Sequence, residues 1–80
     1  MLTGSDVRIQ RVTAGLSGHL VCLRSGITRT RLSAIERGHV IPPDVELRCI
    51  SNAIADIVAG RARLAKLAAE AGLSPEEARL

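Results

Sequence analysis

Three short segments in the first half of the chain each follow a hydroxyl residue and end at a glycine. They cover residues 6–14, 18–25 and 29–37. A serine or threonine side chain accepts hydrogen bonds from the free N–H groups at a helix start, and glycine adopts the left-handed conformation that ends a helix. The spacing therefore predicts three short α-helices. The expected N-caps are Thr3 or Ser5, Ser17 and Thr28, and the closing glycines are Gly15, Gly26 and Gly38.

The second half of the chain predicts a longer helical region. It begins near Pro43, because proline is tolerated in the first turn of a helix. Apolar residues then recur at helical spacing, with Ile50, Ile57, Leu64 and Ala71 standing seven residues apart. We expect a break near Gly60 that divides this region into two packed helices; one long helix is the alternative, because a single glycine costs only about 1 kcal/mol. The "SPEE" capping box at 74–77 predicts a short terminal helix.

Composition favours an all-helical domain. The chain has 80 residues, 46% of them hydrophobic, and it contains no Phe, Trp or Tyr. A core of Leu, Ile, Val and Ala suits helix packing better than a small β-barrel. We therefore predict a compact all-α fold of four to five helices, with a domain at residues 1–58 and a helical extension at 59–80. The apolar positions of the three short helices are Val7, Ile9, Val12, Leu20, Val21, Leu23, Leu32 and Ile35.

The two cysteines are predicted to be small, reduced core residues. Cys22 and Cys49 have neither CxxC spacing nor histidines in a ligand pattern, which argues against a zinc site or any other metal site. Aliphatic residues stand within two positions on either side of each of them, as is typical of buried thiols. The N-terminus lacks the apolar run of a signal peptide, and no stretch approaches 18 uncharged apolar residues. We expect a cytoplasmic protein that neither is exported nor spans a membrane.

Positive charge is concentrated in the first half of the chain. Residues 1–41 contain six arginines and two acidic residues, a net charge of +4, whereas residues 42–80 contain five basic and six acidic residues, a net charge of −1. A polyanion is therefore expected to bind the first half. The three arginines of residues 29–37 are Arg29, Arg31 and Arg37.

The turn at residues 25–28 has the form that a helix-turn-helix requires. Gly26 permits a sharp reversal, and Ile27 fills the space between the two helices. Together with "RIQRVTAGLS", "GITRTRLSAIERG" and "PPDVELRCISNAI", this turn resembles the Cro/repressor, or XRE-type, helix-turn-helix family of phage and bacterial transcriptional regulators. The resemblance covers about residues 6–54. It departs from the family at Gly18, where a glutamine is common, and at Cys22 and Ser25.

The resemblance implies that residues 29–37 form a recognition helix in the major groove of double-stranded DNA. Helical periodicity separately predicts that Leu32 and Ile35 face inward. The base-contacting positions implied by the resemblance are Arg29, Thr30, Ser33 and Ala34. For Arg29, contact with guanine and contact with phosphate alone are both open. The implied phosphate contacts are Ser17, Thr28, Arg31, Arg37 and His39. The family pattern also implies a structural ion pair between Arg11 and Glu36.

These patterns lead us to expect a sequence-specific DNA-binding transcriptional regulator, a repressor that binds a palindromic operator as a homodimer. The expected dimer residues are Ile57, Leu64, Leu67 and Ala68. The alternative is a protein-interaction module, such as an antitoxin or antirepressor, whose C-terminal helices bind a partner protein. Sequence-specific RNA binding is disfavoured because the chain has no aromatic ring on which to stack bases. No catalytic arrangement or cofactor motif is recognised, so we expect no enzyme and no cofactor.

Overall fold

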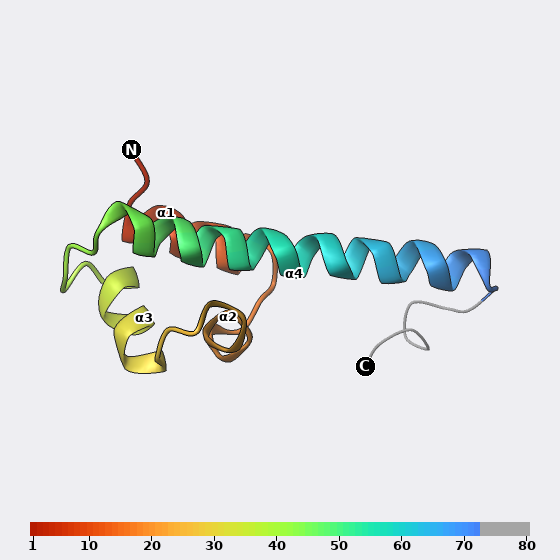
Figure 1. Ribbon diagram of the computed structural model, residues 1–80, viewed down its shortest axis with the longest axis horizontal. Coiled ribbons are helices and arrows are strands. Elements are labelled where there is room, and N and C mark those ends of the chain that lie inside the picture. Colours follow the sequence, from red (N-terminus) through yellow and green to blue (C-terminus); the bar gives the residue numbers. More distant parts are fainter. Residues whose placement is uncertain (73–80) are drawn as a thin grey trace.

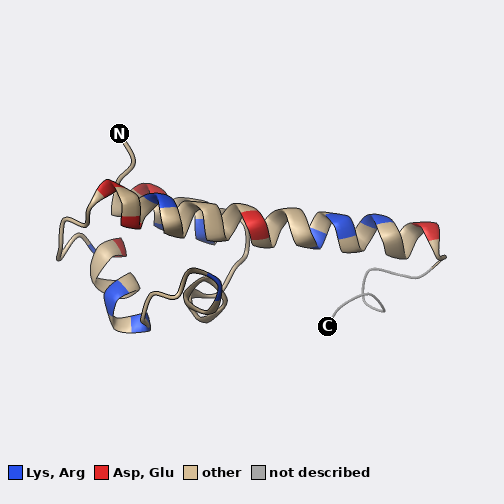
Figure 2. Ribbon diagram, in the orientation of Figure 1, with Lys and Arg blue, Asp and Glu red and all other residues tan. Residues whose placement is uncertain are grey.

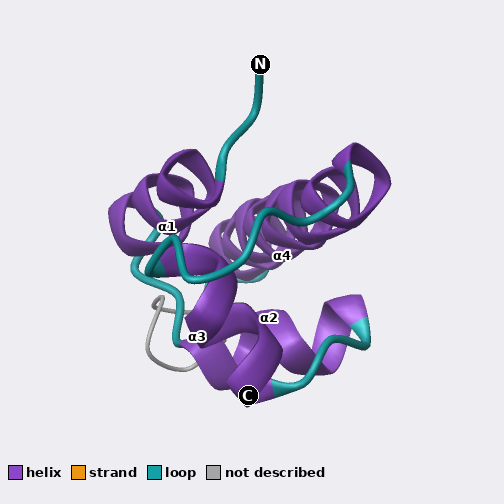
Figure 3. Cartoon of the chain, turned by 90° about the vertical axis from the view of Figure 1, so that its left-hand side faces the viewer, coloured by secondary structure: helices purple, strands orange, loops and turns teal. Residues whose placement is uncertain are grey.

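Residues 1–72 are described in the computed structural model, and they form α-helices without any β-strand (Figures 1 and 3). The helices are α1 (Gly4–Thr13), α2 (Gly18–Ser25), α3 (Arg29–Glu36) and α4 (Asp44–Glu70). The predicted all-α class is confirmed for this part of the chain. The terminal helix predicted from the "SPEE" motif lies outside the described residues.

Local capping chemistry sets the ends of the three short helices. Thr3 caps α1: its Oγ1 accepts a hydrogen bond from Asp6 N at 3.2 Å, and Asp6 Oδ2 accepts one from Thr3 N at 2.9 Å. The first helix therefore begins at Gly4, two residues earlier than expected. Ser17 and Thr28 are the N-caps of α2 and α3. The side-chain oxygen of each accepts a hydrogen bond from the backbone N–H three residues later in the chain. The closing glycines have φ of +70° at Gly15, +78° at Gly26 and +76° at Gly38.

The expected break near Gly60 is wrong, because α4 is continuous from Asp44 to Glu70. A Cβ atom placed at Gly60 would meet nothing within 4 Å, so no packed neighbour forces the chain to turn there. The helical hydrogen bonds on either side then outweigh the cost of one glycine, about 1 kcal/mol. The boundary expected between residues 58 and 59 falls inside this helix. Pro43 is the N-cap of α4 and Asp44 its first residue.

The core lies where α1 and α2 pack on the first half of α4 and α3 packs against α1 and α2 (Figure 1). It consists of Val7, Leu16, Val21, Cys22, Leu32, Ile35, Leu47, Ile50 and Ile54. The second half of α4 extends beyond the three short helices, which gives the molecule dimensions of 46 × 22 × 19 Å. Residues 59–70 of the extension expected after the domain thus continue a core helix directly.

Several apolar residues of α1 and α2 are exposed. Ile9 and Val12 on α1 retain 61% and 57% of their accessible surface, and Leu20 and Leu23 on α2 are exposed as well. A short helix that packs along one narrow stripe buries only part of its apolar content, here Val7 in α1. Leu16, in the loop before α2, is buried and adds a further apolar side chain to the core.

The two cysteines have different environments. Cys22 is buried in the core as expected, whereas Cys49 is exposed and its Sγ donates to the Ser25 carbonyl oxygen at 3.6 Å. The core prediction for Cys49 is wrong because the buried stripe of α4 runs through the neighbouring Ile50 and through Leu47. One residue along a helix turns a side chain by about 100°, which is enough to leave the core.

Candidate nucleic-acid interface

The turn between α2 and α3 is held by three local interactions. Gly26 adopts the left-handed conformation and its N–H donates to the Cys22 carbonyl oxygen at 2.9 Å. Ser25 Oγ accepts from Ile27 N at 3.3 Å, and the Ile27 side chain packs against the core. Thr28 then caps α3. This turn brings the two helices into contact and fixes which side of α3 faces outward.

Helix α3 has one apolar face and one polar face. Leu32 and Ile35 are 3% and 1% exposed and point into the core. Thr30 and Arg37 are exposed on the opposite side, with Ser33 and Ala34 half-buried between them. The outer face therefore combines hydroxyl groups, a methyl group and a guanidinium group. Figure 2 shows the basic and acidic positions of the helices.

Arg11 and Glu36 form a bidentate ion pair. Arg11 Nε lies 2.8 Å from Glu36 Oε2, and Nη2 lies 2.9 Å from Oε1. A third bond runs from Arg11 Nη1 to the Leu16 carbonyl oxygen at 2.9 Å. Hydrogen bonding to the Glu36 carboxylate raises the pKa of the Arg11 guanidinium. The pair fastens the end of α1 to the end of α3 and cancels the negative charge of Glu36 close to the exposed face of α3.

Arg31 is turned toward α4. Its Nε and Nη2 donate to Glu46 Oε1 at 3.1 and 2.9 Å, and both side chains are partly buried. Arg31 is one of the residues expected to contact phosphate. In the protein without DNA, its positive charge is therefore balanced by the Glu46 carboxylate. Glu46 lies fifteen residues away in sequence, and only the packing of α3 near the start of α4 brings the two together.

A polar hollow of about 310 Å³ lies between α1, the start of α2 and α3. We call it the arginine groove; its lining residues are Arg8, Arg11, Gly18, Arg29, Leu32, Ser33, Glu36 and Arg37. Arg8 was absent from the expected site residues. A signal for it exists in the sequence, since Arg8 stands three residues before Arg11 and so lies on a neighbouring position of the same helix.

Three residues expected to contact phosphate lie at the ends of α2 and α3. The hydroxyl oxygens of Ser17 and Thr28 accept backbone hydrogen bonds as N-caps, and their O–H groups retain the capacity to donate. His39 lies in the turn after α3, where its backbone N–H donates to the Ala34 carbonyl oxygen at 2.9 Å. Its side chain is exposed.

The four residues expected at a dimer interface are not equivalent. Leu64 and Leu67, on the projecting half of α4, are 43% and 54% exposed. Ile57 is half-buried because it packs against the core, and Ala68 is buried. The residue that sequence reasoning missed is Val58, a further exposed aliphatic side chain of α4.

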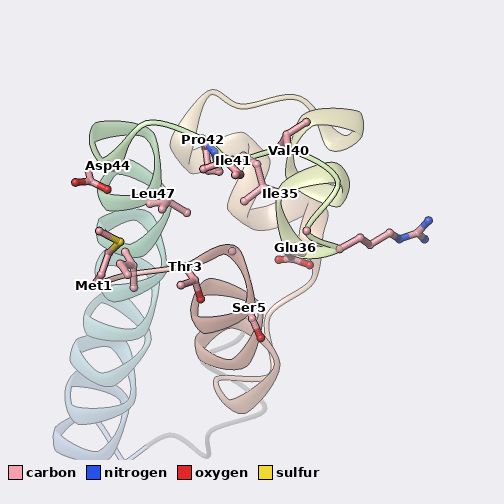
Figure 4. Close-up of a pocket in the computed structure, with 14 residues that line it drawn as sticks. Met1, Thr3, Ser5, Ile35, Glu36, Val40, Ile41, Pro42, Asp44 and Leu47 are labelled. Carbon is pink, nitrogen blue, oxygen red and sulfur yellow. The ribbon is translucent and has the colours of Figure 1, made fainter.

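A second hollow, of about 460 Å³, differs from the arginine groove in being mainly apolar (Figure 4). It lies between the N-terminal segment, the end of α3 and the start of α4, and its apolar lining includes Leu2, Ile35, Val40, Ile41, Pro42 and Leu47. Within residues 1–72, no group of three or more His, Cys, Asp or Glu residues is placed to hold a metal ion. None of the described helices has the length and apolar character needed to cross a membrane.

Comparison of the chain with protein-family models, with curated proteins and with solved structures finds no match. The functional interpretation therefore depends on the geometry and charge of the residues themselves.

Proposed function

We propose that this protein is a sequence-specific double-stranded-DNA-binding regulator of the Cro/repressor helix-turn-helix type, of phage or bacterial origin, and that it acts as a repressor. The observation that carries the proposal is the outer face of α3. An interaction module should expose apolar anchors there, whereas this face presents Thr30, Ser33, Ala34 and Arg37.

The proposed contacts follow from the position of each residue on α3. An eight-residue helix is about 12 Å long and fits the major groove of DNA, where each base pair displays a distinct pattern of donors and acceptors. Thr30, Ser33 and Ala34 are the proposed base contacts, since hydroxyls can bond either kind of base edge and methyl groups can meet a thymine methyl. Arg29, at the start of the helix, would contact either a base or a phosphate.

Phosphate contacts are proposed around this face. Arg37 and His39 lie at the end of α3 and in the turn after it, and Ser17 and Thr28 lie at helix N-termini, where unpaired backbone donors and the helix dipole favour anions. Arg31 would join them once its guanidinium leaves Glu46.

We also propose that the protein binds a palindromic operator as a homodimer. One helix-turn-helix offers few base contacts, and two copies can read half-sites about 34 Å apart. The exposed Leu64 and Leu67 on α4 are the main residues of the proposed dimer surface, with Ile57 and Ala68 at its border.

The test is a salt titration of duplex binding followed by selection from a random duplex pool. Affinity should fall steeply with salt concentration, because each neutralised phosphate releases about one counterion. The selected sequences should share a palindrome. Absence of affinity for any duplex at low ionic strength would refute the proposal.

A second candidate is a protein-interaction module of the antitoxin or antirepressor kind. The observation in its favour is the projecting half of α4 with its exposed apolar residues Val58, Leu64 and Leu67. The two functions can coexist, with DNA on α3 and a protein on α4. Substitution of Arg37 should weaken DNA binding without affecting protein association, whereas substitution of Leu64 should weaken protein association directly.

A further inference from the structure

We propose that the arginine groove is an oxyanion site that holds one phosphate group, bound by Arg8, Arg29 and Arg37 beside the backbone of Gly18. The site deepens the proposed function by assigning Arg29 to phosphate. The inference rests on that function only for the source of the phosphate, which we take to be the DNA backbone.

The charge balance of the groove is the first argument. Of its four arginines, Arg11 is paired with Glu36. The ion pairs formed within residues 1–72 involve Arg11, Arg24 and Arg31 and leave the other three groove arginines without a carboxylate partner. A guanidinium group presents planar pairs of donors that match two phosphate oxygens. The groove thus holds a net charge of +3 and the donors to bind an oxyanion.

Gly18 lies at the edge of the groove. A Cβ atom placed at Gly18 would lie 3.8 Å from Arg29 Nε and 3.8 Å from Leu32 Cδ2, an ordinary van der Waals distance. The Arg29 guanidinium therefore lies beside the first residue of α2. The N–H groups of a helix's first turn have no intrahelical partner and point outward along the axis, so they add donors at this edge of the groove. The Arg29 side chain and the backbone N–H groups at the start of α2 therefore lie at the same edge of the groove.

The position of Arg29 separates it from Thr30 and Ala34. At 100° per residue, Arg29 lies about 100° around α3 from Thr30 and about 140° from Ala34, whereas Ser33 lies about 40° from it and also lines the groove. Its neighbours are Gly18 and Leu32, on the side of α3 that faces α1 and α2. The geometry thus favours phosphate contact for Arg29 and leaves Thr30 and Ala34 as the base-contacting residues farthest from the groove, with Ser33 between the two groups.

Two substitutions at Gly18 provide a matched test. Gly18→Asp places a carboxylate in the groove, and Gly18→Asn places a neutral group of the same size there. A carboxylate in the first turn of a helix is stabilising, so Gly18→Asp should melt at a temperature no lower than Gly18→Asn. Any loss of anion binding by Gly18→Asp is then separate from folding.

The first measurement is a titration with inorganic phosphate, followed through the ¹H–¹⁵N signals of the Gly18 amide and of the arginine Nε groups. Saturable shifts are expected at Gly18, Arg8, Arg29 and Arg37 in the unsubstituted protein and in Gly18→Asn, and not in Gly18→Asp. Equal shifts at Arg24 and Arg48, outside the groove, would overturn the site, and so would the absence of any shift.

The second measurement is duplex binding over a range of salt concentrations. Relative to Gly18→Asn, Gly18→Asp should bind duplex about tenfold more weakly, the loss expected for one charge-assisted contact. Its log–log salt slope should be smaller by about one. Arg29→Ala should weaken all duplex sequences alike, and loss of discrimination at one base pair would overturn its assignment to phosphate.

The outcomes distinguish the two proposals. If duplex binds Gly18→Asp and Gly18→Asn equally, the assignment of the groove to a DNA phosphate is refuted and the proposed function stands. If inorganic phosphate binds in the groove but no duplex does, the proposed function is refuted and the site stands, with a free phosphate compound as its ligand.

Discussion

Arg11 Nε and Glu36 Oε2 lie 2.8 Å apart, in an ion pair that joins the last turn of α1 to the last turn of α3. The Glu36 side chain is only 8% exposed, so its charge is withheld from solvent as well as cancelled by the guanidinium. Both effects favour a polyanion near α3. The pair also explains how a short helix with two buried side chains keeps a fixed orientation.

Replacing Glu36 by alanine should lower the free energy of unfolding by about 3 kcal/mol, because it leaves a mostly buried guanidinium without its charge partner. Glu36→Gln, which keeps one acceptor and the side-chain volume, should lose less. Urea denaturation followed by circular dichroism measures both. An unchanged midpoint for Glu36→Ala would contradict the structural role of the pair.

Local chemistry was sufficient to predict the three short helices. Their ends depend on a hydroxyl group and a glycine within the same few residues, and the observed bounds differ from the predicted ones by no more than two residues. The inward positions of Leu32 and Ile35 also follow from periodicity alone. These features depend on interactions between residues that are close together in the sequence, so they can be predicted from it.

The features that the sequence did not reveal depend on contacts between distant segments. Whether α4 bends at Gly60 depends on what packs there, and the sequence cannot show that nothing does. The compensation of Arg31 by Glu46 likewise requires α3 to lie near the start of α4. Arg8 was overlooked for the same reason, because the groove that it lines is formed by three separate helices.

Gly60→Ala should raise the free energy of unfolding by about 1 kcal/mol, since α4 is helical through this residue and alanine favours a helix. Gly26→Ala is the matched control: a Cβ atom meets nothing within 4 Å at either position, but Gly26 has φ +78°. The control should lose about 1–2 kcal/mol from the left-handed backbone alone. Chemical denaturation of both variants checks this, and destabilisation by Gly60→Ala would argue for a bend in α4.

Releasing Arg31 from its partner should strengthen DNA binding. In Glu46→Gln the guanidinium is free to reach a phosphate, so duplex affinity should rise by up to about fivefold, the value of a partly exposed ion pair. Asp56→Asn is the matched control, because it removes one negative charge and releases Arg24, which lies outside the proposed contacts. Duplex titrations compare the two variants. An equal rise in both would mean that net charge alone is responsible and that Arg31 makes no specific contact.

Stability should decline at alkaline pH through Cys22. Burial raises the pKa of the Cys22 thiol, so the folded state keeps its proton at pH values where the unfolded state loses it. The contribution is complete below the unfolded-state pKa and is lost as pH rises through the folded-state pKa. Denaturation midpoints measured across this range should fall for the unsubstituted protein and for Cys49→Ala, and fall less for Cys22→Ala. The same decline in all three would assign the effect to other groups.

The proposed dimer should depend on Leu64 and Leu67, which project from α4 beyond the core and remain exposed in the single chain. Replacing both by alanine removes apolar surface from each copy of a two-fold interface, so the loss is counted twice, and dimer dissociation should become at least about a hundredfold easier. Alanine favours a helix more than leucine does, so α4 should persist. Val45→Ala is the control, since Val45 is 72% exposed on the first half of the same helix, outside the proposed surface. Sedimentation should show a dimer for the unsubstituted protein and for Val45→Ala and a monomer for the double variant. A dimer in all three proteins would show that the interface does not include these leucines. A monomer in all three would contradict the homodimer and favour a different partner protein for the exposed face of α4.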